Sequence, residues 1–340
     1  MSGFNLTLGV ALVSGAIGAG AALLAVNPSL MTAAKPVQPA PSGKERELGS
    51  SRKAPITNKR RDPTLVAAGD IACDPAAPTF NNGFGATNSC RQRYTAELLA
   101  RLHPDAVLVL GDDQYDDPRY TKYLRSYDIT WGRFKRISYP TPGDGFSMRG
   151  YYRYWGRRAR PSGVPWYSFR LGAWRVLSLD SNCSLIRGCG SGSPQVEWLR
   201  RDLQGHPADC QLAFWHEPRF SSTEPADTVR MKSIWRVLSE FGVELVLSGN
   251  AHNYERFAGL DASGHPRPGG VRQFIVGTGG KSLSPFTRRS PGRKRGNSGT
   301  FGVLKLTLHP QSYAWRFVPL PESRFGHARS FSDAGAASCH

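Results

Sequence analysis

The sequence predicts an α/β domain with one mixed sheet or two stacked sheets, and two observations predict it. Over residues 64–113, two short apolar runs that end in Gly-Asp flank an amphipathic segment, an order typical of a β–α–β unit in a parallel sheet. Further along the chain, apolar runs of strand length alternate with two more helical segments. Because 39% of the 340 residues are hydrophobic, the chain can build a sizeable core, which excludes a wholly disordered protein.

The expected helices have apolar residues at helical spacing and recognisable ends. In segment 96–104 the helix is expected to end before Pro104. Segment 193–203 opens with Ser193 as a cap, and segment 229–242 ends at Gly242. The expected strands are apolar runs bounded by glycine, proline or polar residues; two of them look paired and the last two form a hairpin. In order, the strands are TLVAAGD (64–70), AVLVLGDD (106–113), the pair PWYSFRLG (165–172) and AWRVLSLDSN (173–182), LAFWHE (212–217), VELVLSGN (243–250), QFIVGTGG (273–280), and the hairpin FGVLKLTLHP (301–310) and SYAWRFVPL (312–320).

The N-terminal part differs in composition from the rest. Residues 4–26 are apolar and rich in small residues, as in the core of a secretory signal or in a single membrane span. No Lys or Arg precedes them, and for an anchor the basic flank on the C-terminal side would favour a cytoplasmic body. Residues 27–62 are rich in Pro, Ala, Ser and basic residues, as in flexible linkers. We therefore expect a signal peptide or anchor at 1–30, a basic linker at 31–62 and one domain at 63–340.

The six cysteines favour disulfides over a zinc site, because none of them forms a CxxC pair. Their even number and a short loop between two of them suit a protein of an oxidising compartment, secreted or extracytoplasmic. The alternative is six reduced, buried thiols in a cytosolic protein. We expect the pairs Cys183–Cys189, Cys73–Cys90 and Cys210–Cys339.

The charge of the chain is strongly basic. Lys and Arg outnumber Asp and Glu by 44 to 26, which gives a net charge of +18. A positive surface attracts polyanions such as phosphorylated substrates, nucleic acids, anionic polymers or lipids. The Arg residues are scattered, which favours a generally basic, solvated surface. We expect no specific nucleic-acid partner, since no nucleic-acid-binding motif is present and aromatic residues are not interleaved with the basic runs.

Polar residues of a similar kind follow four of the expected strands. In open α/β sheets, ligands bind beyond the carboxyl ends of the strands. Two carboxylates, a phenol and two imidazoles that converge there are ligands suited to a pair of metal ions. Asn250 and His252, two residues apart, are expected to project to one side of an extended segment. The residues at the strand ends are Asp70, Asp112 with Tyr115, His216, and Asn250 with His252.

Glycines precede several of these residues, namely Gly69, Gly111, Gly143 and Gly249. We expect them to permit tight turns that direct the next side chain into the crevice.

Five short motifs occur in sequence along the chain: GD at 69–70, GDDQY at 111–115, PTPGDGF at 140–146, WHEP at 215–218 and GNAHNYER at 249–256. As an ordered set they resemble the motifs of the calcineurin-like metallophosphoesterases, in particular the purple acid phosphatase-type branch. The resemblance extends from about Thr64 to Phe317 and is specific as a set. It implies a sandwich of two mixed β-sheets flanked by helices, with a two-metal site at the carboxyl ends of the strands.

Carried over by motif position, the resemblance implies two metal sites that share Asp112. The first would use Asp70, Asp112, Tyr115 and His252. The second would use Asp112, Asp144, His216 and Asn250. The ions would be divalent or mixed-valence, chosen from Fe, Mn, Zn and Mg. We expect catalytic roles for Asp112 and His216, and for Arg219, which with Arg149 and Arg153 lies next to the motifs and could bind phosphate or serve only as surface charge.

Three positions depart from the pattern of the family. Where the family has asparagine this chain has Asp144, where it has histidine this chain has Gly145, and where it has a second histidine this chain has Asn250. Asp144 and Asn250 keep oxygen donors, which favours hard ions such as Mn²⁺ or Mg²⁺ over Zn²⁺ at the second site. Gly145 removes an imidazole that resembles the acid for the leaving group, and such a loss costs about 10²–10⁴-fold in rate.

The resemblance therefore implies a phosphomonoesterase or phosphodiesterase that uses a metal-bound hydroxide and acts on a phosphorylated small molecule or polymer. The alternative is a catalytically impaired pseudo-phosphoesterase that binds phosphorylated or anionic ligands in the same cleft.

Overall fold

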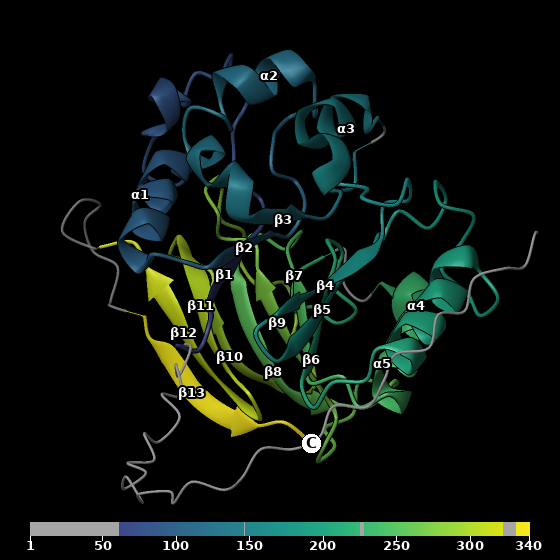
Figure 1. Ribbon diagram of the computed structural model, residues 1–340. Coiled ribbons are helices and arrows are strands. Elements are labelled where there is room, and N and C mark those ends of the chain that lie inside the picture. Colours follow the sequence, from purple (N-terminus) through teal and green to yellow (C-terminus); the bar gives the residue numbers. More distant parts are fainter. Residues whose placement is uncertain (1–60, 146, 225–227, 322–330) are drawn as a thin grey trace, which may run out of the picture. The chain divides into compact units, whose positions relative to one another are not determined.

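The computed structural model describes residues 61–145, 147–224, 228–321 and 331–340 (Figure 1). The expected signal peptide or anchor at 1–30 lies outside these residues, as does the expected linker up to residue 60. Within the described ranges, no helix combines the length and hydrophobicity needed to cross a membrane.

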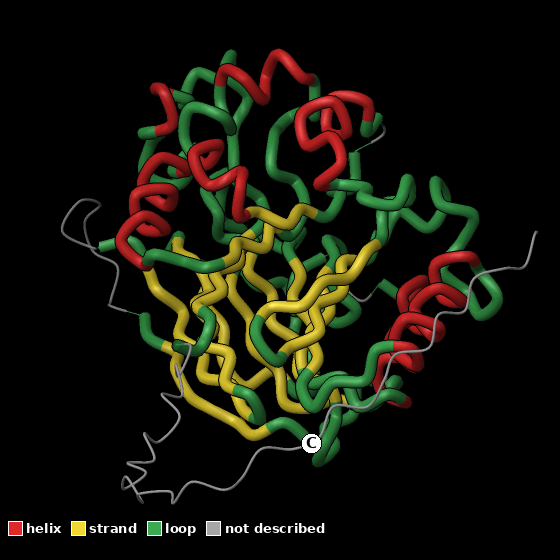
Figure 2. Tube along the Cα trace, in the orientation of Figure 1, coloured by secondary structure: helices red, strands yellow, loops and turns green. Residues whose placement is uncertain are grey.

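Two mixed β-sheets form the centre of the domain, as the sequence predicts (Figure 2). The first has the strand order β13-β12-β11-β1-β2-β3, and the second has the order β10-β8-β9-β7-β6-β5-β4. The strands of the first sheet are β1 (Thr64–Ala68), β2 (Ala106–Val109), β3 (Ser138–Pro140), β11 (Gly302–His309), β12 (Ser312–Pro319) and β13 (Asp333–Ser338). Those of the second are β4 (Tyr167–Leu171), β5 (Trp174–Ser178), β6 (Gln211–Phe214), β7 (Leu245–Ser248), β8 (Tyr254–Leu260), β9 (Val271–Val276) and β10 (Arg293–Asn297).

Each sheet has a parallel part. Strands β1, β2 and β3 are parallel in the first sheet, and β5, β6, β7 and β9 are parallel in the second. The expected pair β4–β5 and the expected hairpin β11–β12 are both antiparallel. Parallel strands present all their carboxyl ends at one edge, so each sheet gathers its strand-end residues in one place.

The second sheet is buried on both faces. Along β6, Leu212 and Phe214 join the apolar cluster shared with the first sheet, while Ala213 packs with the helices on the other side. Along β7, Leu245 likewise belongs to the cluster shared with the first sheet, and Val246 packs with the helices on the other side. This two-residue alternation with apolar residues on both faces explains why the strands read as continuous apolar runs.

The helices cover the sheets in two groups (Figure 1). Helices α4 and α5 pack together beside the second sheet, where Leu199, Leu203 and Ile234 are buried against it. The three helices that the sequence predicts are all present, as α1, α4 and α5. The helices are α1 (Gln92–Leu102), α2 (Tyr120–Arg125), α3 (Arg149–Trp155), α4 (Pro194–Gly205) and α5 (Lys232–Glu240), with short 3₁₀ turns at Asn81–Gly83, Trp131–Ile137, Gly156–Arg158 and Val229–Met231.

Three disulfides connect the predicted cysteine pairs. Cys73–Cys90, Cys183–Cys189 and Cys210–Cys339 have Cα–Cα distances of 5.3, 5.2 and 5.5 Å, within the usual range for a disulfide. The last of them ties the residue after β13 to the residue before β6, so it links the two sheets.

Candidate metal centre

The carboxyl ends of the parallel strands from the two sheets meet at one place. The amide of Gly69, after β1, donates to the carbonyl of Val276 at the end of β9 (2.9 Å). The Nδ1 of His216, after β6, donates to the carbonyl of Leu110 after β2 (2.8 Å). Side chains from both sheets can therefore converge on one ligand.

The two aspartates that follow β1 and β2 have an unusual backbone. Asp70 and Asp112 have φ angles of 59° and 45°, and Asn250 after β7 has a φ of 65°. This left-handed region is disfavoured for residues with a side chain. The three turns are therefore held by their surroundings, and the strained residues are the predicted ligands themselves.

The glycines before these residues mostly serve close approach instead of the expected tight turn. Of the four, only Gly111 has a left-handed φ (81°). A Cβ on Gly143 would lie 1.8 Å from Oδ1 of Asp112, and a Cβ on Gly249 would lie 2.7 Å from Oδ2 of Asp70. Glycine is required at these two positions because backbone and carboxylates share the same small space.

Asp70 is fully buried and is hydrogen-bonded from three sides. The hydroxyl of Tyr115 donates to its Oδ1 (2.7 Å), Nε2 of His252 lies 3.2 Å from the same oxygen, and the amide of Asn250 donates to Oδ2 (2.8 Å). Burial raises the pKa of Asp70, but the charge and hydrogen bond of His252 outweigh it and hold this pKa below its ordinary value. Asp70 is thus an anion in the folded protein.

His216 is also fully buried, and its orientation is fixed by the bond from Nδ1 to Leu110. Its Nε2 lies 3.6 Å from Oδ1 of Asp112 and has no hydrogen-bond partner among the described residues. Burial lowers the pKa of His216, but Asp112, then Asp70 and Asp144, raise it to about 9. The surrounding carboxylates therefore draw positive charge to this point, here as a proton.

Asp112 lies between the other acidic groups. Burial raises its pKa, and the charges of Asp144 and Asp70 raise it further, against the opposing effect of His216. Ligand atoms of Asp70, Asp112 and His216 all lie within 4.8 Å of one another. Close carboxylates that repel each other, next to a buried imidazole nitrogen with no partner in the described part of the chain, fit a metal cation, because a cation would offset the repulsion and could take this nitrogen as a ligand.

Tyr115 and His252 lie together at the side of Asp70. The Tyr115 hydroxyl is 3.0 Å from Nε2 of His252, whose Nδ1 bonds Ser282 (2.7 Å). Burial and the nearby Asp112 and Asp70 raise the pKa of Tyr115 well above its ordinary value. Four predicted residues, Asp70, Asp112, Tyr115 and His252, are therefore in one cluster.

The remaining two predicted ligands take a different part. Asp144 is exposed, and its backbone amide approaches Oδ1 of Asp112 (3.2 Å), while its carboxylate is close enough to influence the pKa of Asp112. The prediction that the chain is extended from Asn250 to His252 is wrong. Bonds from the Ala251 amide to Gly249 and from the Asn253 amide to Ala251 close tight turns there, so Asn250 reaches Asp70 through its backbone.

The arginines near the motifs lie in different surroundings. Only 6% of Arg219 is exposed, and its guanidinium lies over the ring of Phe220 (4.4 Å). Arg149 and Arg153 line a cavity of about 690 Å³ that shares Pro118 with the pocket around Asp112. The catalytic role of Arg219 stays a prediction.

Sequence reasoning missed two residues at the end of β5. Asp180 is buried, and Oδ1 accepts bonds from the amide and from Nδ2 of Asn182 (2.8 and 2.7 Å). Nδ2 of Asn182 also donates to the carbonyl of Gly143 (2.7 Å), next to Asp144. The signal was present, since Asp180 follows an apolar strand as Asp70 and Asp112 do.

Comparison with solved structures identifies the fold. Purple acid phosphatase PPD1 from yellow lupin (Lupinus luteus) seeds is similar with a TM-score of 0.60 at 17% identity, over 81% of this chain and 53% of that one. PhoD is similar with a TM-score of 0.51 at 12% identity, over 82% and 70% of the two chains. GAP50, the anchor in the inner membrane complex of Plasmodium, gives 0.53 at 12% identity, over 83% and 90%.

Sequence comparison finds distant relatives. Phosphoenolpyruvate phosphatase of Allium cepa is 24% identical over 283 residues, which are 70% of this chain and 57% of that protein. The uncharacterized protein Rv2577 of Mycobacterium tuberculosis is 29% identical over 140 residues, which are 37% of this chain and 24% of that protein. The chain thus matches between a quarter and just over half of the length of these relatives. No protein-family profile matches it.

The chain therefore has the fold of the calcineurin-like metallophosphoesterases, with two mixed sheets flanked by helices, as the motif resemblance implies. Its structural neighbours include a purple acid phosphatase, and a cluster that can hold a metal ion lies at the strand ends.

Proposed function

We propose that this chain hydrolyses phosphoester bonds at the Asp112 site with two bound metal ions. The observation that carries the proposal is the convergence of Asp70, Asp112 and His216, from two sheets, with a buried Nε2 that has no partner among the described residues. The proposed first ligand set is Asp70, Asp112, Tyr115 and His252. The proposed second set is Asp112, Asp144, His216 and Asn250.

The reaction transfers the phosphoryl group from an ester oxygen to water. The water oxygen forms the new P–O bond, the ester P–O bond breaks with its electron pair going to the alkoxide, and the proton lost by water reaches the alkoxide through solvent. Bound cations would supply Lewis-acid polarisation of the phosphoryl oxygens and activation of water.

The protein's part is to hold these groups before any substrate arrives. The carbonyl of Leu110 holds Nδ1 of His216, and the hydroxyl of Ser282 holds Nδ1 of His252. Each contact directs the other ring nitrogen, Nε2, into the site. Glycines at 143 and 249 let the backbone approach the carboxylates closely. Such fixed groups need no rearrangement during the reaction, which is how a preorganised site lowers a barrier.

Replacement of Asp112 by asparagine tests the proposal. We expect Asp112→Asn to lower turnover of p-nitrophenyl phosphate by about 10²–10³-fold or more, because the shared carboxylate is lost from both ligand sets. Metal content by mass spectrometry, with added Mn²⁺, Zn²⁺ or Fe²⁺, is the second readout. Asp209→Asn, at an exposed aspartate before β6, is the matched control and should change neither. Full turnover by Asp112→Asn would contradict the proposal.

A second candidate is a protein that binds a phosphorylated or anionic ligand without cleaving it. The observations that favour it are the absence of a side chain at Gly145 and the backbone contact of Asn250. It predicts one metal or none per chain, binding of inorganic phosphate, and no turnover with any added metal.

We also propose that the protein works outside the cytoplasm, as a secreted or membrane-anchored protein acting on a phosphorylated small molecule or polymer. Three disulfides support this, because cytosolic thiols are normally kept reduced.

A further inference from the structure

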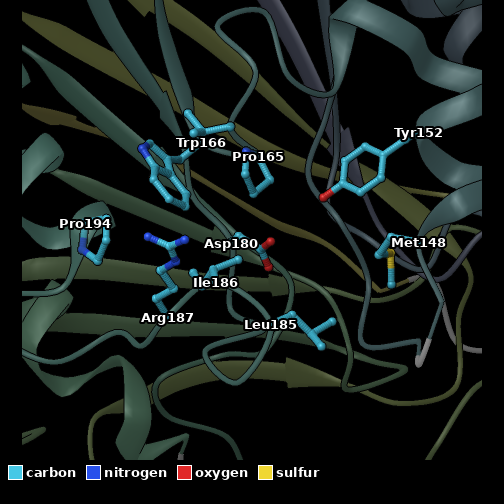
Figure 3. Close-up of a pocket in the computed structure, with 10 residues that line it drawn as sticks. Met148, Tyr152, Pro165, Trp166, Asp180, Leu185, Ile186, Arg187 and Pro194 are labelled. Atoms are coloured by element: carbon cyan, nitrogen blue, oxygen red, sulfur yellow. The ribbon is translucent and has the colours of Figure 1, made fainter. Parts of the chain in front are cut away.

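A further cavity, of about 400 Å³, is shown with its lining residues in Figure 3. We call it the Trp166 pocket. Its walls are mostly apolar and include Met148, Trp166 and Leu185, with Tyr152, Asp180 and Arg187 as polar groups. In Figure 3, the side chains of Tyr152 and Arg187 reach into the pocket from opposite sides. The volume and the few polar groups are typical of a site for a small molecule.

The Trp166 pocket adjoins the pocket that contains Asp112 and Asp144. Met148 lines both of them. Asn182 joins them a second time, since its Nδ2 donates both to Asp180 in the Trp166 pocket and to the carbonyl of Gly143 (2.7 Å each). The two pockets are therefore adjacent, and Met148 belongs to the walls of both.

A disulfide-closed loop forms one wall of this pocket. Leu185, Ile186 and Arg187 lie between Cys183 and Cys189, which are bonded to each other. Leu185 is 59% exposed, unusually high for leucine, whereas Trp166 is 7% exposed. An exposed leucine at the rim and a buried indole behind it offer apolar surface that a flat ligand could cover.

Gly145 lines the pocket around Asp112 and has no side chain that could give a proton to a leaving alkoxide, which limits the alcohol that can leave from this site. Without a group to protonate it, a leaving alkoxide must be stable by itself. Aromatic alcohols leave as stabilised phenolates, and their rings suit a pocket of Trp166, Met148 and Tyr152.

We propose that the Trp166 pocket binds the aromatic ring of a phosphoester whose leaving group is a phenol. This inference rests on the proposed function, because it places the phosphoryl group of the same substrate at Asp112.

The binding test uses phosphonates, which cannot be hydrolysed. Isothermal titration of the full chain with Mn²⁺ compares 2-naphthylmethylphosphonate with methylphosphonate. We expect the naphthyl compound to bind about 10- to 100-fold more tightly, because its ring is removed from water. Trp166→Ala should remove about tenfold of this preference. Leu185→Ala, at an exposed position that the fold does not depend on, should remove about fivefold. Val229→Ala, also exposed (67%) but outside the pocket, is the control.

The turnover test compares 2-naphthyl phosphate with phenyl phosphate, whose leaving groups have similar acidity. We expect a higher kcat/KM for the naphthyl ester, and Leu185→Ala should reduce the ratio of the two kcat/KM values. Val229→Ala, outside the pocket, should leave turnover of both esters unchanged. Equal affinity for the two phosphonates, or a preference unchanged in both variants, would overturn the pocket assignment. Selective phosphonate binding with no turnover of any ester would instead support the pocket and refute the proposed hydrolysis.

Discussion

At the scale of single residues, Gly145 is a position where a histidine can be introduced. Its backbone lies outside the left-handed region, and a Cβ there would be 3.4 Å from Cε of Met148 and 3.5 Å from Cδ of Pro118, ordinary contacts. We expect Gly145→His to raise kcat/KM for ethyl phosphate by about tenfold or more relative to p-nitrophenyl phosphate, since only the poor leaving group needs a proton.

Gly145→Ala is the control, because it adds the Cβ without an acid and should leave the ratio of the two esters unchanged. A ratio that stays the same in Gly145→His would show that the imidazole does not reach the leaving oxygen.

Asp180 predicts a pH dependence of stability. Burial raises its pKa from 3.8 to about 6, so the folded protein favours the protonated form. The resulting contribution of Asp180 to the free energy of unfolding is fully present below about pH 4 and is lost as the pH rises through about 6. Relative to Asp180→Asn, which stays neutral, the wild type should therefore lose about 2–3 kcal/mol in the free energy of unfolding between pH 4 and pH 7. Urea unfolding of both proteins across this range measures it. A constant difference would contradict the raised pKa.

The site residues show what a sequence can and cannot reveal. The strand-end pattern predicted the cluster of Asp70, Asp112, His216 and His252 because a parallel sheet gathers its strand ends. The strand-end pattern could not predict the role of Asn250. Its left-handed φ, which turns the backbone amide towards Asp70, depends on neighbouring segments.

At the scale of elements, the disulfides differ in the length of chain that they close. Cys210 and Cys339 are 129 residues apart, and Cys183 and Cys189 only six. Because the restriction of the unfolded chain grows with loop length, we expect loss of the first to cost about 5 kcal/mol in the free energy of unfolding and loss of the second about 2 kcal/mol. Chemical denaturation of the Cys210→Ser/Cys339→Ser and Cys183→Ser/Cys189→Ser proteins compares them, and the reverse order would refute the chain-entropy argument.

Elements that the sequence did not predict depend on tertiary contacts. Helix α3 has only seven residues, too few for a clear periodic pattern. It is held by Tyr151, Tyr154 and Trp155, which pack into the core, and Nε1 of Trp155 donates to Asp113 (2.5 Å). Strand β8 contains the charged pair Glu255 and Arg256, whose partners lie far away in the sequence, such as Ser222 and Asp333. No local pattern encodes such partners.

At the scale of the whole domain, a metal ion at this site would join the two sheets. Asp70 and Asp112 come from the first sheet, and His216 and His252 come from the second. A ligand that binds only the folded protein at 100 times its Kd adds about 2.7 kcal/mol of stability. We expect EDTA to lower the Tm of the Mn²⁺-loaded protein by roughly 5 °C.

In Asp112→Asn the same treatment should leave the Tm nearly unchanged, whereas Asp209→Asn should respond as the wild type does. Scanning calorimetry of the three proteins with and without EDTA makes the comparison, and an equal shift in all three would place the stabilising ion elsewhere.

The pairing of β1 with β11 in the first sheet also determines the order in which the domain can be completed during synthesis. The first sheet takes β1, β2 and β3 from residues 64–140 and β11, β12 and β13 from residues 302–338, whereas all strands of the second sheet lie between them, at 167–297. A chain made from its N-terminus can therefore form the second sheet first, while the edge of β1 stays unpaired. Because unpaired edges promote association between chains, the nascent protein is most vulnerable to aggregation just before residues 302–309 emerge from the ribosome.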